Sequence, residues 1–232
     1  MIYVQIRELV VPGQLIAEGK YKVWDGAFRD GDKIYSSVVG LADPRGDSIR
    51  VIPLQGRYFP KRDDLVVGVV IDIHYSGWIV DLNSPYNGNL FVSDLLRRKV
   101  DLTKEDISRY LNIGDVLVAK VKDVDERMRV LLDAGGPGMG KVTKGKLVEV
   151  TPAKVPRIIG RKGSMVSMLK SVSGCDLKVG QNGRIIIEGK NIKMVNAVVE
   201  ALLMIDREAH TTGLTDRVRL MLEKIKEGGE NG

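Results

Sequence analysis

The most informative stretch of the chain reads Pro156-Arg157-Ile158-Ile159-Gly160-Arg161-Lys162-Gly163-Ser164-Met165. Two glycines three positions apart allow a backbone turn to approach a ligand without obstruction by side chains. A helix expected from Ser164 would point its N-terminal amides at the same place, which favours an anion there. Arg161 and Lys162 add positive charge at the tip of the turn. The stretch therefore predicts a loop that contacts sugar-phosphate, beside a groove for unstacked bases lined by Ile158, Ile159, Val166 and Leu169.

The residues around this loop predict a small α/β domain. Working outward, apolar patterning indicates, in chain order, a strand at 145–150, helices at 153–159 and 164–173, strands at 175–179 and 184–188, and a long helix at about 192–211. Residues 141–190 carry 11 Lys or Arg and 3 Asp or Glu, a net charge of +8, whereas the whole chain of 232 residues carries +6. Because the excess lies in one segment, a local anionic partner is favoured over general basicity.

The segment at 62–134 predicts a five-stranded β-barrel. Short apolar strands are expected at 65–74, 78–82, 89–92, 116–124 and 127–132, with one or two helical stretches between 93 and 111. A helical insert between the third and fourth of five short strands is the layout of the OB barrel, which binds oligonucleotides. Residues 61–134 have a net charge of −2, so we expect the barrel to guide RNA rather than to hold it tightly.

Five parts are expected along the chain: an all-β domain at 1–61, the barrel at 62–134, a glycine-rich linker at 135–141, the α/β domain at 142–212 and a C-terminal helix or tail at 213–232. The first part has no cluster of catalytic residue types, which favours a scaffold or docking role. The linker places Gly135, Gly140 and Lys141 at the spacing of a phosphate-binding P-loop. Val142 follows where that motif requires Ser or Thr, so a plain flexible linker is favoured.

Composition argues against several classes of protein. One cysteine, Cys175, and two histidines, His74 and His210, make a disulfide framework or a metal site improbable. No apolar run approaches the ~18 residues that span a membrane, and the N-terminus lacks the layout of a signal peptide. No Ser/His/Asp set and no supported pair of acids is present. We therefore expect a soluble, cytoplasmic protein that is not an enzyme, with no catalytic residues, metal or cofactor.

Two segments resemble known RNA-binding domains. The loop at 160–163, within its strand–helix–loop–helix–strand–strand–helix order, resembles the KH domain of type I, whose loop clamps about four nucleotides. Residues 62–134 resemble the S1-type OB domain through their patterns at 68–70, 75–82, 88–95 and 114–129. In OB barrels, aromatic side chains on the second and third strands can stack bases, at ~1–3 kcal/mol each. Tyr75 and Trp78 occupy such positions, although Trp78 is equally compatible with core packing.

The whole chain resembles the archaeal exosome cap subunits of the ribosomal-RNA-processing type, which carry a β-domain, an S1-type barrel and a KH domain. The resemblance implies a non-catalytic subunit, three copies of which cap a hexameric ring of phosphorolytic ribonuclease subunits. It also implies that the first domain docks on the ring, and that the cap binds single-stranded, A-rich RNA 3′ tails and guides them into the central pore. The implied RNA-binding residues are Ile159, Gly160, Arg161, Lys162, Gly163 and Ser164 in the KH loop, and His74, Tyr75, Trp78, Lys120 and Arg129 in the barrel, with Arg97, Arg98, Lys99, Lys122 and Arg127 as further pore-facing candidates.

Three other interpretations remain open. The chain could be a stand-alone RNA-binding transcription or translation factor with S1-type and KH modules. Bacterial polynucleotide phosphorylase has the same two domain types, but in the opposite order and after catalytic domains that this sequence does not show. An enzyme in its own right is disfavoured by the missing catalytic constellation.

Overall fold

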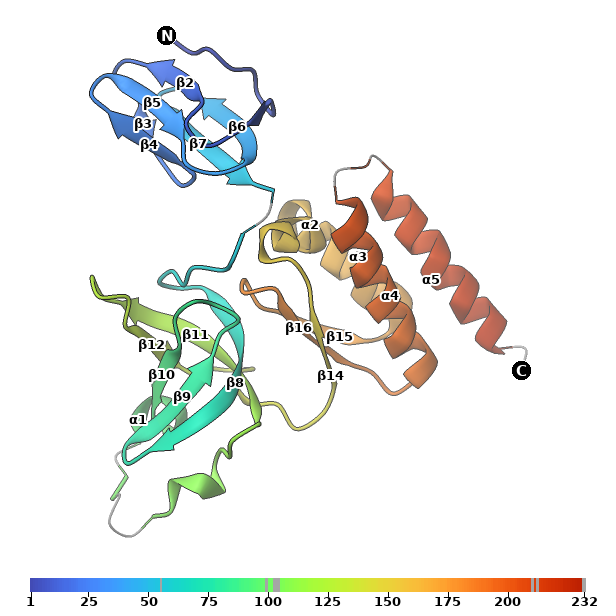
Figure 1. Cartoon of the computed structure of the whole chain (residues 1–232). Helices are drawn as coiled ribbons and strands as arrows, with labels where there is room; N and C mark the ends of the chain where they lie inside the picture. The colour runs from blue at the N-terminus through green and yellow to red at the C-terminus, as the bar shows by residue number, and fades with distance from the viewer. Residues whose placement is uncertain (55, 99, 102–104, 210, 212, 231–232) are drawn as a thin grey trace. The chain divides into compact units, whose positions relative to one another are not determined.

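The computed structural model of the chain describes all residues except 55, 99, 102–104, 210, 212 and 231–232. The chain forms two compact units, Met1–Gly56 and Arg57–Gly232 (Figure 1). Within the described residues, none of the helices has the length and apolar character needed to cross a membrane.

The first unit contains two small β-sheets, in agreement with the all-β domain that the sequence predicts. One sheet has the strand order β1-β6-β7-β3 and the other β2-β5-β4. The strands are β1 (Leu9–Val10), β2 (Leu15–Glu18), β3 (Lys22–Val23), β4 (Ala27–Asp30), β5 (Lys33–Ser36), β6 (Gly40–Arg45) and β7 (Ser48–Pro53). Ile16, Ile34 and Ile49 are fully buried between them. Aliphatic rather than aromatic side chains thus form this core, which matches the low aromatic content of the chain.

The second unit begins with the closed barrel that the sequence predicts. Its strands are β8 (Leu65–His74), β9 (Gly77–Asp81), β10 (Gly88–Phe91), β11 (Val116–Val124) and β12 (Val130–Asp133). Pairing runs β12-β10-β9-β8-β11, and a further β11–β12 pairing closes the ring. The helical insert between the third and fourth strands consists, in the described residues, of α1 (Val92–Leu96) and the short 3₁₀ helix η1 (Ile107–Arg109).

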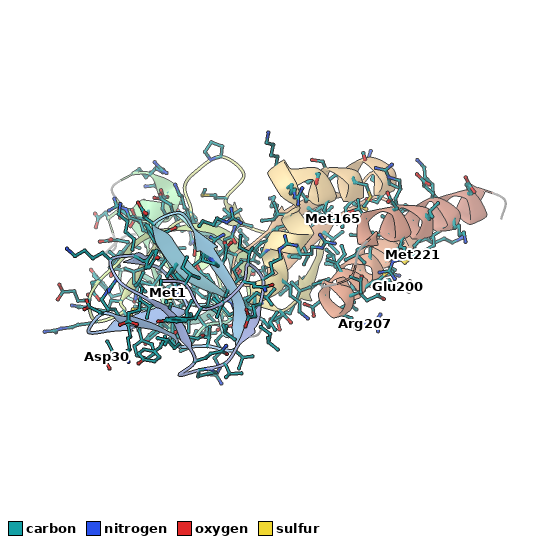
Figure 2. The ribbon with its side chains drawn as sticks, turned by 90° about the horizontal axis from the view of Figure 1, so that it is seen from above. Met1, Asp30, Met165, Glu200, Arg207 and Met221 are labelled. Carbon is teal, nitrogen blue, oxygen red and sulfur yellow. The ribbon has the colours of Figure 1, made fainter. Side chains whose placement is uncertain are left out.

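The rest of the second unit has the element order predicted for a type I KH domain. Its strands β14 (Lys146–Glu149), β15 (Asp176–Val179) and β16 (Arg184–Glu188) form a sheet of order β14-β16-β15. Its helical segments are η2 (Pro152–Lys154), α2 (Val155–Ile159), η3 (Arg161–Gly163), α3 (Ser164–Ser173), α4 (Ile192–Glu208) and α5 (Leu214–Glu230). Met165 on α3, Arg207 on α4 and Met221 on α5 mark the helical part in Figure 2. The expected fold class, an all-β domain, an OB barrel and an α/β KH domain, is confirmed.

Candidate RNA-binding surfaces

The loop at 160–163 connects α2 to α3 through a sharp turn that needs both glycines. Gly160 has φ 76° and ψ 175°, a backbone region open essentially to glycine alone. A Cβ on Gly160 would lie 2.7 Å from the amide nitrogen of Met165, so there is no space for a side chain either. Gly163 has φ 79° and ψ 11°, and a Cβ there would meet nothing closer than 3.9 Å. Gly160 therefore combines a conformational with a steric requirement, whereas Gly163 has only the conformational one.

Positive charge gathers on this loop without an acidic neighbour at the start of the helix. Arg161 and Lys162 are exposed, and Lys162 adopts left-handed backbone angles of φ 50° and ψ 32°. Ser164, also exposed, begins α3, whose first turn has no acidic residue and no side-chain cap. The uncapped amides and the two cations therefore lie together, as phosphate binding requires.

The apolar side chains beside the loop divide into core and surface positions. Ile158 and Leu169 are fully buried in the KH core, so they support the groove rather than line it. Ile159 and Val166 are only partly buried and pack against that core. Of the four side chains that the sequence assigns to a groove, these two remain available to bases.

On the barrel, an exposed aromatic side chain lies at the β8–β9 turn. Tyr75 is 73% exposed, and the neighbouring His74 at the end of β8 is also exposed. His74 Nε2 lies 4.0 Å from Asp72 Oδ2. A flat, solvent-accessible ring such as that of Tyr75 offers a stacking platform for a base.

Trp78, in contrast, belongs to the barrel core, and this corrects its assignment as an RNA contact. Its side chain is 1% exposed, and its Nε1 donates a hydrogen bond of 2.9 Å to the carbonyl of Leu111. Side chains alternate between the two faces of a strand, and Trp78 shares the inner face of β9 with Val80. The spacing Trp78-x-Val80-x-Leu82 was the sequence signal for this position.

Phe91 is an exposed aromatic residue of the barrel that the sequence analysis does not name. It is 41% exposed at the end of β10. Its partner on the neighbouring strand β9 is Gly77, which lies two residues after Tyr75 in the chain. A Cβ on Gly77 would lie 2.1 Å from the carbonyl oxygen of Leu90, so the two strands approach closely here. Alternation with the buried Leu90 and Val92 could have placed Phe91 outside.

Family models match all three folded parts of the chain. One described as the N-terminal domain of the exosome RNA-binding protein RRP4 matches residues 7–55, one described as the RRP4 S1 domain matches 57–123, and a KH domain model matches 145–193. The chain is 45% identical to the exosome complex component Rrp4 of Pyrococcus abyssi, over all of this chain and 88% of that protein. The chain belongs to the Rrp4 family.

Other relatives agree with this membership. The exosome complex component Rrp4 of Methanothermus fervidus is 48% identical, over 94% of this chain and 96% of its own length. A crystal structure described as that of a candidate exosome complex RNA-binding protein is 39% identical, with a TM-score of 0.70. The match covers 74% of this chain and 98% of that one. The predicted family resemblance is therefore confirmed.

In this Rrp4-family chain, the barrel and the KH domain are joined by a buried polar contact. Asn182, fully buried, donates from Nδ2 to the carbonyls of Val67 and Leu82, at 2.7 and 2.9 Å. Its Oδ1 accepts from the amide of Val67 at 3.2 Å. Beside it, Arg184 donates to the Asp81 carboxylate at 2.5 Å and to Glu149 at 2.7 Å. The turn between β15 and β16 therefore packs against the barrel.

The glycine-rich segment is more ordered than its composition predicts. Gly140–Lys141 forms β13, which pairs with β11, and Lys141 Nζ contacts Asp115 Oδ2 at 2.5 Å. Met139 packs with Val67, Val118 and Ile186, an apolar cluster that spans barrel and KH strands. Both ends of this short segment lie in one compact unit. The segment pairs with the barrel, so it does not act as the plain flexible linker that its composition predicts.

Most basic candidates on the barrel are already paired with carboxylates. Lys120 contacts Asp63 at 2.7 Å, and the hydrogen bond lowers the pKa of that carboxyl. The other pairs are Arg129–Asp125, Lys122–Asp94, Arg97–Asp133 and Arg98–Glu105, all between 2.6 and 2.8 Å. Lys99 lies outside the described residues. Among those described, no group of three His, Cys, Asp or Glu could hold a metal ion.

Proposed function

We propose that the chain is a non-catalytic, cytoplasmic cap subunit of an archaeal-type exosome. Three copies would cap a hexameric ring of phosphorolytic ribonuclease subunits, bind single-stranded, A-rich 3′ tails and guide them into the central pore. Membership of the Rrp4 family supports the exosome assignment. The observation that carries RNA binding is the loop at 160–163, where two cations and an uncapped helix end lie together.

The two RNA-binding domains would divide the task. In the KH loop, Arg161 and Lys162 make no ion pair with any described residue, so their charge is available to phosphate. On the barrel, carboxylates already neutralise Lys120 and Arg129. The barrel would therefore contribute stacking through Tyr75 and guide the strand, while the KH loop holds the backbone.

The N-terminal unit would dock on the ring. Eleven of the nineteen exposed large apolar side chains among the described residues lie in its first 56 residues. Trp24 at 61% exposed, Ile6 at 64% and Leu9 at 56% are the largest contributors beyond the terminus. Because most of the exposed large apolar side chains belong to this one small unit, a protein contact is favoured over a role in RNA binding.

A charge reversal at the loop tests the RNA-binding part of the proposal. Arg161→Asp with Lys162→Asp should weaken binding of a labelled single-stranded RNA at least tenfold, as measured by anisotropy, because two phosphate contacts become repulsive. The matched control is Lys20→Asp with Lys22→Asp, which reverses two exposed lysines in the other unit. Equal affinities for the two variants would contradict the assignment of the loop.

Assembly and activity test the remaining parts. The chain alone should show no phosphate-dependent 3′→5′ degradation, and clear activity would make it an enzyme instead. Pull-down from an archaeal lysate should recover a hexameric nuclease. Recovery of RNA polymerase or ribosomes without that nuclease would favour the stand-alone factor.

A further inference from the structure

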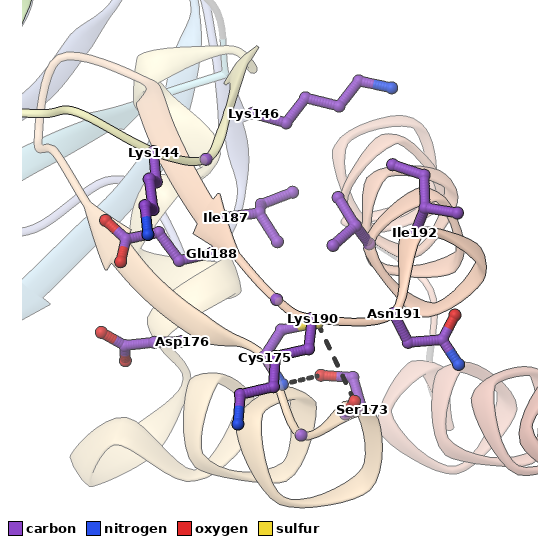
Figure 3. Close-up of a pocket in the computed structure, with 14 residues that line it drawn as sticks. Lys144, Lys146, Ser173, Cys175, Asp176, Ile187, Glu188, Lys190, Asn191 and Ile192 are labelled. Atoms are coloured by element: carbon purple, nitrogen blue, oxygen red, sulfur yellow. Dashed lines mark hydrogen bonds between the residues drawn. The ribbon is translucent and has the colours of Figure 1, made fainter.

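A pocket of about 880 Å³ lies at the opposite end of α3 from the loop at 160–163. Figure 3 shows it where α3 turns into β15, where β16 runs into α4, and where the chain enters β14. Because α3 has ten residues, about 15 Å separates its two ends. Neither the KH loop nor the barrel aromatics contribute to its lining.

The floor of the pocket is apolar. Ile187 and Val195 are buried beneath it, and Ile192 at its edge is 68% exposed. Gly189 keeps the floor open, because a Cβ there would lie 2.6 Å from the sulfur of Cys175. Cys175 itself is tied to the turn, since its amide donates to Ser173 Oγ at 3.1 Å (Figure 3).

The charged lining leaves an excess of positive charge. The acidic residues Asp176 and Glu188 are compensated by lysines from outside the pocket, Lys170 at 2.6 Å and Lys178 at 3.9 Å. The lining lysines are Lys144, Lys146 and Lys190, and none of them makes an ion pair with a residue that the structure describes.

This charge does not depend on the helix that starts beside the pocket. Asn191 caps α4, its Oδ1 accepting from the amides of Lys193 and Met194 at 2.9 and 3.4 Å. The first-turn amides are therefore satisfied, and the lysines are the groups left to attract an anion. An apolar floor with a cationic rim suits a ligand that has a flat apolar part and a negative charge beside it.

We propose that this pocket is a second contact for single-stranded RNA, with a base on the apolar floor and phosphates on Lys144 and Lys190. The inference rests on the proposed RNA-binding function. At about 3.4 Å of rise per stacked nucleotide, the length of α3 corresponds to about four to five nucleotides. A strand clamped by the loop over about four nucleotides would reach the pocket when it is about nine nucleotides long.

The test compares two RNA lengths on the full chain. Lys144→Gln with Lys190→Gln should weaken binding of a mixed-sequence RNA of about twelve nucleotides roughly three- to tenfold. It should also reduce the slope of log affinity against log salt by about 1.4, because two phosphate contacts are lost. Binding of an RNA of about four nucleotides, which only the loop can hold, should stay unchanged. Lys20→Gln with Lys22→Gln is the matched control.

A second variant tests the apolar floor separately from charge. Ile192→Ser should weaken the longer RNA without changing the salt slope, and because Ile192 is largely exposed, folding should be preserved. Equal affinity of the pocket and control variants for the longer RNA would overturn the proposal, even where the loop variant still loses binding. Absence of RNA binding by the unaltered chain would overturn the proposed function instead. Binding of poly-L-glutamate is measured with the same variants. If the pocket variants lost binding of poly-L-glutamate but kept binding of the longer RNA, the pocket would be assigned to acidic polypeptides and the proposal would be overturned.

Discussion

At the scale of single residues, the two loop glycines should respond differently to a methyl group. Gly163→Ala places alanine in the left-handed region with open space around it, and should destabilise the chain by about 1–2 kcal/mol. Gly160→Ala adds a contact with the Met165 backbone to a conformation that alanine avoids, so it should destabilise by more than about 3 kcal/mol. Urea unfolding of both variants measures the difference. Similar losses of stability in the two variants would show that the backbone at Met165 moves aside for the added methyl group without a cost in free energy.

The aromatic residues of the barrel give a second prediction at this scale. Tyr75→Ala and Phe91→Ala should each lower RNA affinity by about 1–3 kcal/mol and leave the melting temperature nearly unchanged, because both rings are exposed. Trp78→Ala should instead destabilise the fold by about 3–5 kcal/mol, because it empties the barrel core. Calorimetry and anisotropy on the same samples separate the two effects. If the Trp78→Ala variant kept the melting temperature of the unaltered chain but bound RNA poorly, Trp78 would be an RNA contact after all.

At the scale of elements, local sequence patterns predict most of the strands and helices, but few of the contacts between the barrel and the KH domain. Alternation and turn residues are properties of neighbours in the chain, so the barrel strands and the KH order could be predicted from the sequence. Asn182 sits in a turn of glycine and polar residues that is typical of solvent-exposed loops. Its burial arises from a partner 115 positions away, Val67, which no local pattern encodes. The pairing of Gly140–Lys141 with β11 joins residues 22 and 24 positions apart, which a local pattern does not encode either.

The turn at 180–183 should therefore control how firmly barrel and KH domain are joined. Asn182→Ala removes three hydrogen bonds and leaves backbone groups of Val67 and Leu82 without that partner, which should destabilise the chain by about 2–4 kcal/mol. Gln181→Ala is the matched control, because Gln181 contacts the barrel through its backbone amide, at 2.7 Å from the carbonyl of Leu65. Hydrogen exchange should show β8 opening more often in the first variant only. Unchanged exchange at β8 would mean that the apolar cluster around Met139 suffices.

At the scale of the whole molecule, the division into two units predicts that RNA binding and docking can be separated. Residues 1–56 carry seven Lys or Arg and seven Asp or Glu, so removing them leaves the net charge at +6. Residues 57–232 form a compact unit with their own cores, and this fragment should fold alone and bind single-stranded RNA within about twofold of the full chain. It should no longer associate with a hexameric nuclease ring in size-exclusion chromatography with light scattering. Retained association would place the docking surface on the barrel or the KH domain, and a large loss of RNA affinity would show that the first unit takes part in holding the strand.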